Sequence, residues 1–251
     1  MTDTHAHLDF LEAEELAQVL KEDLKALRAL LTLGVDPSRW ERTLNLAQGK
    51  VYAAVGLHPT AAHLLSPEVE EALAHYARHP RVRAIGETGL DYYWTPETRS
   101  LQLRALEVQG ALAEALDLPL VLHVRSKDGQ AEEDLAAWLL VHRPKKAVLH
   151  AFSAHPALER AGLEVGAYFS FAGPLTYRKN AHLREALARL PEDRLLVETD
   201  TPYLPPEPHR GKRNRPLYLR HTLEAMAQAR KLTFEEAEAL TDGNAAKLFR
   251  F

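Results

Sequence analysis

The chain has 251 residues, of which 46% are hydrophobic and 26% are charged, and its formal net charge is -4 at pH 7. These values are typical of a globular protein, and the length suits one large α/β domain or two small ones. The absence of cysteine excludes disulfides, thiolate nucleophiles and thiolate metal sites, so any metal must be bound through nitrogen and oxygen atoms.

The sequence contains no apolar stretch that approaches the ~18 residues of a membrane span, and no basic-then-apolar leader opens it. We therefore expect a cytoplasmic protein with no membrane contact, and no feature indicates an obligate protein partner. The slightly acidic balance does not favour nucleic-acid binding over the whole surface, although one local segment is basic.

Short apolar runs alternate with longer amphipathic segments along the chain. Several of the runs are continuous rather than alternating, as expected for parallel strands that are buried on both faces. The predicted strands are Asp3–Leu8, Ala29–Leu33, Val51–Leu57, Val82–Gly86, Leu120–Val124, Ala147–Ala151, Ala167–Phe171 and Leu195–Glu198.

Several helix ends can be predicted between these runs. Ser66 and Thr95 each precede a proline and a glutamate, a pattern typical of an N-cap followed by proline in the first helical turn. Thr233 and Glu236 form a capping-box pattern that opens the last helix, and Gly243 is the predicted end of that helix.

Eight strands, each followed by a helix, predict an α/β protein with the (β/α)8 TIM-barrel fold. An open doubly wound sheet is the alternative, but the first strand-to-helix turn, His5 to Phe10, lacks the glycine-rich phosphate loop of that fold. No linker or repeat divides the chain, so we expect a single domain over residues 1–251.

Two histidines, His5 and His7, lie two residues apart in the first predicted strand. Residues at this spacing point to the same face of a strand, and two neutral imidazoles side by side are suitable ligands for a divalent cation. Four more candidate ligands end later apolar runs, namely Glu87, His123, His150 and Asp200.

In a TIM barrel these six side chains would meet at the C-terminal ends of the strands, where active sites of this fold lie. A lone strand-end histidine is more often a hydrogen-bonded core residue, and a lone carboxylate is often a helix cap or an ion-pair partner. Together the six exceed what one catalytic metal needs, and they suit two ions about 3.5–4 Å apart that share a carboxylate. Buried polar groups without such a shared partner would cost several kcal/mol, which argues against coincidence.

These motifs, in this order and spacing, resemble the TatD family of metal-dependent deoxyribonucleases, which belongs to the amidohydrolase-like TIM barrels. The resemblance covers essentially the whole chain. The matching segments are Asp3–Asp9, Gly56–Pro59, Ile85–Tyr93, Leu118–His123, His150–Ser153, Glu198–Leu204, Arg210–Asn214 and Asn244–Phe249.

The resemblance implies that His5, His7 and Asp200 hold one metal ion, that His123 and His150 hold the other, and that Glu87 bridges them. It also implies hydrolysis of DNA, often as a 3′→5′ exonuclease on single strands, with Mg²⁺ or Mn²⁺, and with Zn²⁺ in some members. Asp200 and Glu87 are the predicted catalytic residues, with Asp200 placed to take a proton from the attacking water.

The substrate would be a single-stranded DNA end, held by residues around the mouth. His58 ends the third strand, and the resemblance implies that Arg125 reaches phosphate. A charge run is more often a solvated face, but Arg210–Arg215 carries four cations directly beyond the eighth strand, which favours phosphate binding. Aromatic residues after the strand ends could stack on unpaired bases. The predicted substrate contacts are His58, Asp91, Tyr92, Arg125, Tyr203, Arg210, Lys212, Arg213 and Asn214.

Two other functions fit parts of the pattern. A barrel hydrolase of a small ester or amide could use the same metals, but that class commonly bridges its ions with a lysine, and the corresponding strand carries Glu87. A non-catalytic nucleic-acid-binding barrel is the third reading, and the intact set of candidate ligands argues against it. The identity of the metal, the choice between DNA and RNA, and exo- or endonucleolytic action are open at this stage.

Overall fold

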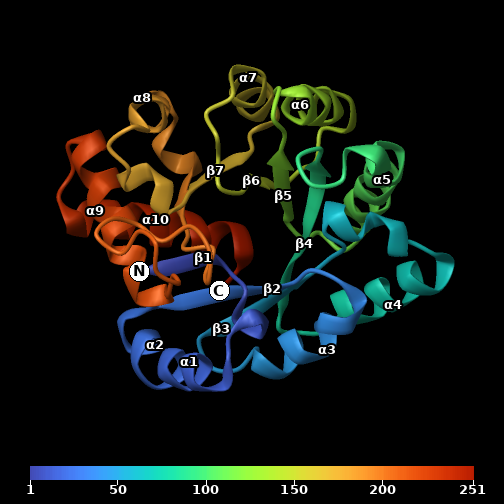
Figure 1. Cartoon of the computed structure of the whole chain (residues 1–251), viewed down its shortest axis with the longest axis horizontal. Helices are drawn as coiled ribbons and strands as arrows, with labels where there is room; N and C mark the ends of the chain where they lie inside the picture. Colours follow the sequence, from blue (N-terminus) through green and yellow to red (C-terminus); the bar gives the residue numbers. More distant parts are fainter.

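The computed structural model describes residues 1–251, and its eight strands form one parallel sheet in the order β1 to β8 (Figure 1). The strands are β1 (Thr2–Ala6), β2 (Ala29–Gly34), β3 (Val51–Val55), β4 (Val82–Asp91), β5 (Leu120–Arg125), β6 (Ala147–Leu149), β7 (Tyr168–Phe171) and β8 (Leu195–Val197).

The sheet closes on itself between β1 and the segment that follows β8. Ala6 forms a parallel bridge with Thr201, the amide of His7 donates to the Thr201 carbonyl at 2.7 Å, and the amide of Asp200 donates to the His5 carbonyl at 2.8 Å. This closure confirms the predicted TIM barrel and excludes the open doubly wound sheet.

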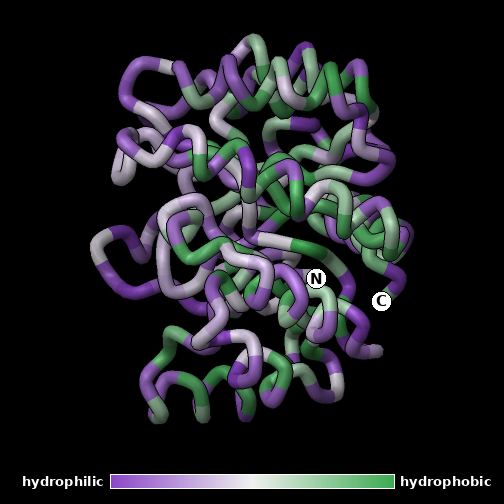
Figure 2. Tube along the Cα trace, turned by 90° about the vertical axis from the view of Figure 1, so that its right-hand side faces the viewer, coloured by the Kyte–Doolittle hydropathy of each residue, from purple (hydrophilic) through white to green (hydrophobic).

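Helices surround the barrel, and Figure 1 shows them as an outer ring around the strands. The helices are α1 (Ala13–Gln18), α2 (Leu24–Ala26), α3 (Pro37–Leu46), α4 (Pro67–Ala77), α5 (Arg99–Ala115), α6 (Gln130–His142), α7 (Pro156–Val165), α8 (Ala181–Arg189), α9 (Leu219–Arg230) and α10 (Phe234–Phe249). Hydrophobic and hydrophilic residues alternate along the helical turns in Figure 2, as expected for helices with one face on a sheet. None of the helices is long and apolar enough to cross a membrane.

The two faces of the strands belong to two different hydrophobic clusters. The larger cluster joins one face of the strands to the surrounding helices. The smaller cluster takes the alternate side chains of β2 to β8, such as Val121 in β5 and Val148 in β6, and adds Leu248 and Phe249 from the end of α10. Because side chains alternate across a strand, the smaller cluster fills the barrel interior, and the residues two positions further along β5 and β6 face the mouth.

Most predicted strands differ from the structure by one or two residues at one end, and β4 and one helix differ by more. The first strand ends at Ala6 rather than Leu8, while β4 continues to Asp91 rather than ending at Gly86. The helix expected at Thr95 begins at Arg99, after a short 3-10 turn, because the Thr95 hydroxyl donates to the Asp91 carbonyl instead of capping a helix.

The predicted stop of the last helix at Gly243 is wrong. The capping box between Thr233 and Glu236 is confirmed, but α10 runs on to Phe249. Leu248 and Phe249 are buried in the barrel-interior cluster, and this burial favours continuing the helix past glycine.

Phe169 tests the packing between the barrel and its helices. Its ring is fully buried and meets the Phe152 ring with a centroid distance of 4.9 Å. Phe169→Ala should lower the free energy of unfolding by about 3–5 kcal/mol, because it leaves a cavity in the core, as measured by urea denaturation. Val141→Ala, at a side chain that is 77% exposed, is the control and should stay within about 0.5 kcal/mol of the parent. A similar small effect of both substitutions would contradict this account of the core.

Candidate metal centre

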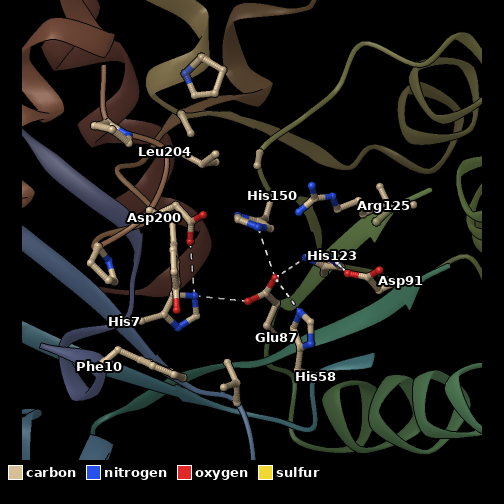
Figure 3. Close-up of a pocket in the computed structure, with 18 of the residues that line it drawn as sticks. His7, Phe10, His58, Glu87, Asp91, His123, Arg125, His150, Asp200 and Leu204 are labelled. Carbon is tan, nitrogen blue, oxygen red and sulfur yellow. Dashed lines mark hydrogen bonds and ion pairs between the residues drawn. The ribbon is translucent and has the colours of Figure 1, made fainter. Parts of the chain in front are cut away.

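Five of the six predicted ligands lie at or near the C-terminal ends of β1, β5, β6 and β8, and the sixth, Glu87, lies within β4. Figure 3 shows how His7, Glu87, His123, His150 and Asp200 point toward one another. The strands thereby bring together residues from the beginning, the middle and the last quarter of the chain. The six residues are His5, His7, Glu87, His123, His150 and Asp200, and five of them are buried.

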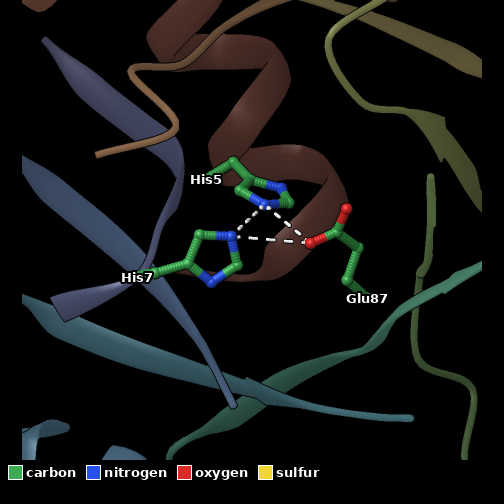
Figure 4. Close-up of side chains that lie close together, drawn as sticks. All are labelled: His5, His7 and Glu87. Atoms are coloured by element: carbon green, nitrogen blue, oxygen red, sulfur yellow. Dashed lines mark hydrogen bonds and ion pairs between the residues drawn. The ribbon is translucent and has the colours of Figure 1, made fainter. Parts of the chain in front are cut away.

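Glu87 lies at the centre of this group, and each of its carboxylate oxygens faces a different pair of histidines. Its Oε2 atom is 3.3 Å from Nε2 of His5 and 3.5 Å from Nε2 of His7 (Figure 4). Its Oε1 atom is 2.7 Å from Nδ1 of His123 and 3.3 Å from Nε2 of His150. A carboxylate that divides its oxygens in this way has the arrangement of a ligand shared by two cations.

Asp200 completes the group around His5 and His7. Its Oδ1 atom lies 3.4 Å from Nε2 of His7 and 3.7 Å from Nε2 of His5. The backbone of Asp200 is in the left-handed region, with φ of 60°, and its amide is held by the carbonyl of His5. A strained backbone fixed by a hydrogen bond to β1 is typical of a functional side chain.

The donor set fits divalent metal ions. Nε2 of His5 and Nε2 of His7 are only 3.2 Å apart, and both face carboxylate oxygens. Three-residue groups of closely spaced donor atoms occur on both sides of the shared carboxylate, His5 with His7 and Glu87 on one side, and His123 with His150 and Glu87 on the other. Imidazole nitrogen and carboxylate oxygen suit Mg²⁺, Mn²⁺ and Zn²⁺.

The charges of the group shift the acid–base properties of its members. Burial opposes the charged form of His150, but the negative charges of Glu198 and Glu87 outweigh it and raise the pKa of His150 to about 10. Burial also opposes the charged form of His7, but Asp200 raises its pKa to about 8. Burial would raise the pKa of Glu87, yet His150 and His5 hold it well below its usual range. A cation that binds here replaces protons, so metal binding is coupled to proton release.

Glu198 supports the centre, and the sequence reasoning gave it no role. Its Oε1 atom accepts from Nδ1 of His150 at 2.8 Å and from the amide of Ala151 at 2.8 Å. A carboxylate behind a histidine fixes the ring so that the other nitrogen faces the metal. The sequence indicates a role for Glu198 through its spacing, because Glu198 ends the same apolar run as Asp200 and precedes it by two residues.

Asp3 is a second supporting carboxylate that the sequence reasoning did not single out. It is fully buried and accepts from the amide of Thr199 at 2.9 Å and from the hydroxyl of Thr199 at 2.6 Å. Burial raises the pKa of Asp3 to about 7, against the effect of these hydrogen bonds. The contact ties β1 to the segment after β8 directly beneath the ligands.

Asp91, a predicted substrate contact, lies against the predicted ligand His123. Its Oδ2 atom is 3.0 Å from Nε2 of His123, and its Oδ1 atom accepts from the amides of Tyr93 at 3.0 Å and Trp94 at 2.9 Å. Gly89 permits this arrangement, because its φ is 137° and an added Cβ would lie 2.0 Å from the carbonyl oxygen of His123. The close approach of β4 to β5 therefore positions both Glu87 and Asp91.

A cavity of about 1110 Å³ opens above these ligands. Both polar and aromatic side chains line it, so it offers positive charge and stacking surfaces next to the ligands. Six of the predicted substrate contacts lie in its wall, namely His58, Asp91, Arg125, Tyr203, Arg210 and Lys212.

The other three predicted contacts, Tyr92, Arg213 and Asn214, are not part of the cavity wall. The Tyr92 hydroxyl donates to Asp134 at 2.8 Å. Arg213 pairs with Glu15 at 2.7 Å. Tyr92 and Arg213 are therefore engaged with other residues of the chain outside the cavity wall.

The buried amide of Asn214 donates to the carbonyls of Thr199 and Tyr203, each at 2.8 Å. Arg215 turns away from the cavity and forms an ion pair with the buried Asp23. Within the basic segment, Arg210 and Lys212 line the cavity. Asn214 instead stabilises the segment after β8 through its hydrogen bonds.

Glu198→Gln tests the support of His150. The amide keeps the shape of the side chain but removes the charge that orients the imidazole, so metal affinity should fall by about 10–100-fold. Competition with a chelator of known affinity would measure this change. The control is Glu164→Gln, at a side chain that is 56% exposed, and equal affinities of the two variants would contradict the role of Glu198.

Comparisons with known proteins agree with this geometry. A family model described as "TatD related DNase" matches residues 2–250. The chain is 34% identical to the uncharacterized metal-dependent hydrolase YabD of Bacillus subtilis over 258 residues, which cover 99% of this chain and 98% of YabD. It is 36% identical over 203 residues to a protein of Klebsiella pneumoniae named 3'-5' ssDNA/RNA exonuclease TatD, covering 79% of this chain and 76% of that protein.

The solved structures show the same likeness. The crystal structure of YjjV, a TatD homolog from Escherichia coli K12, matches with a TM-score of 0.91 and 29% sequence identity, covering 100% of this chain and 98% of YjjV. The family match spans residues 2–250 and so includes all six predicted ligands. The chain therefore belongs to the TatD family of metal-dependent hydrolases.

Proposed function

We propose that this protein hydrolyses phosphodiester bonds with two divalent metal ions, as a deoxyribonuclease that shortens single-stranded ends from 3′ to 5′. The observation that carries the proposal is the position of Glu87, whose two oxygens each face a separate pair of imidazoles. Two-metal centres of this kind suit in-line displacement at phosphorus.

The residues divide into two sets that would each hold one ion. His5, His7 and Asp200 form the first set, His123 and His150 form the second, and Glu87 belongs to both. Two bound divalent ions would lower the pKa of a water molecule and offset the charge of the attacking and leaving oxygens.

Asp200 is the proposed general base. Burial would raise the pKa of its carboxyl, but the hydrogen bond from His7 and the charge of His150 hold it below its usual value. Asp200 is therefore ionised at neutral pH and can accept a proton from the attacking water.

Positive side chains around the cavity support a nucleic-acid substrate. Arg125, Arg210 and Lys212 lie in its wall, although the chain as a whole is acidic. Arginine binds phosphate oxygens through paired hydrogen bonds. The name of the Klebsiella pneumoniae relative, which refers to single-stranded DNA and RNA, supports the same substrate class.

The activity test uses a 5′-labelled single-stranded DNA oligonucleotide and metal-stripped protein to which Mg²⁺, Mn²⁺ or Zn²⁺ is restored separately. We expect a metal-dependent ladder that shortens from the 3′ end. Asp200→Ala should lower the rate by about 10²–10⁴-fold or more, because it removes both a base and a ligand. Asp193→Ala, at an exposed carboxylate, is the matched control. An intact oligonucleotide in protein that holds two metal ions would overturn the deoxyribonuclease proposal.

The metal content tests the shared role of Glu87. The parent protein should bind two ions per chain, whereas Glu87→Gln should retain at most one, because the substitution weakens both sets at once. Elemental analysis after gel filtration would measure the ratio of metal to protein. Glu133→Gln, at an exposed residue of α6, should keep two ions. Two firmly bound ions in Glu87→Gln would contradict the bridging role.

A further inference from the structure

Aromatic side chains flank the ligands on two opposite sides of the cavity. On the side of His7, the ring centroids of Phe10 and Tyr203 lie 5.6 and 6.1 Å from that of His7. Figure 3 shows Phe10 on this side, next to His7, whereas Asp91 and Arg125 lie on the other side, beyond His123. Tyr203 is 49% exposed, so part of its ring is free for contact.

Trp94 is the aromatic residue on the side of His123. It lines the cavity and is 64% exposed, whereas Trp40 and Trp138 are 0% and 7% exposed. The ring of Tyr93 meets that of Trp94 edge-on, with a centroid distance of 4.8 Å. The guanidinium of Arg125 lies 5.6 Å from the centroid of Trp94, which places a phosphate-binding group beside this ring.

Both aromatic positions are tied to the metal ligands through the backbone. The amide of Trp94 donates to Oδ1 of Asp91, and Oδ2 of the same carboxylate contacts His123. On the opposite side, the amide of Tyr203 donates to the carbonyl of Asp200 at 2.7 Å. The backbone that carries each ring is therefore fixed relative to one half of the centre.

Exposed rings at these two places call for a ligand. A tryptophan exposed at a cavity wall leaves apolar surface that a bound ligand can remove from water. Aromatic side chains beside cations are how proteins hold unpaired bases, each stack contributing about 1–3 kcal/mol. A base inside a duplex has both faces covered by its neighbours, so these rings would accept only an unpaired one.

We propose that the cavity binds one dinucleotide step of a single strand, with one base stacked on Trp94, the next base stacked on Tyr203, and the scissile phosphate between them at Glu87. This inference rests on the proposed function and adds the recognition of bases on both sides of the cleaved bond. The two rings select single strands by requiring an exposed base face, without reading the base identity.

The kinetic test uses strands that lack one base next to the scissile bond. Trp94→Ala should raise KM for the intact strand by about tenfold, and Tyr203→Ala should do the same. The effect of Trp94→Ala should vanish when the base on one side of the bond is absent, and that of Tyr203→Ala when the base on the other side is absent. Trp94→Phe should recover most of the affinity, and Val141→Ala is the control for an exposed apolar residue.

Two kinetic results would overturn the inference while leaving the proposed function intact. One is a loss that is equal on intact and base-lacking strands for either variant. The other is that the effects of both substitutions on KM vanish with the same base-lacking strand, since this would place both rings on one side of the bond.

A fluorescence titration tests the inference even if no strand is hydrolysed. Because Trp40 and Trp138 are buried, Trp94 is the tryptophan that a ligand in the cavity can quench. A phosphorothioate-linked single strand should quench the emission of the metal-loaded protein, and a fully abasic strand of equal length should quench it far less. Trp94→Phe should abolish the difference between the two strands. Equal quenching by both strands, or none, would overturn the inference.

Discussion

The contact of one buried carboxylate with four imidazoles is the constraint on which the rest of the site depends. Glu87 is 3% exposed, and an isolated ionised carboxylate at such a depth would be costly. Four imidazoles offset this cost, those of His5, His7, His123 and His150. The first two come from β1 and the residue after it, and the other two come from β5 and the end of β6. The barrel must close accurately between β1 and β8 for these side chains to meet, and Asp3 and the bridge from Ala6 to Thr201 hold that closure.

The register of β4 explains why one strand supplies so much of the site. Its pairing with β5 shifts between Ile85 and Thr88, so Glu87 lies within the irregularity, and Gly89 and Asp91 follow it at alternate positions of the strand. Glu87 therefore faces the centre, Gly89 lets the chain pass close to β5, and Asp91 reaches His123. A strand without the register shift, or with a side chain at position 89, could not place Glu87 and Asp91 in these contacts.

The fold and the ligands follow from local signals, whereas the supporting contacts do not. Each strand and its candidate ligand can be predicted from a continuous apolar run that ends in a histidine or an acidic residue, because such a run involves only a few neighbouring residues. The partners of Arg213 and Arg215 could not be read in this way, because Glu15 and Asp23 lie 198 and 192 residues away. Gly243 likewise has a local tendency to end a helix, which the burial of more distant side chains overrides. Glu198 can be read as a strand-end carboxylate, but its partner His150 lies on another strand, as does His123, the partner of Asp91.

Asp91 gives the site a property that neither the metals nor the cavity has alone. One oxygen of its carboxylate contacts the ring of His123, and the other holds the backbone at Tyr93 and Trp94. A cation that fixes His123 also fixes Asp91, and with it the loop that carries Trp94. Coupling between two binding events is reciprocal. In the proposed two-metal centre, a strand bound at this loop would therefore slow the loss of the ion that His123 would hold.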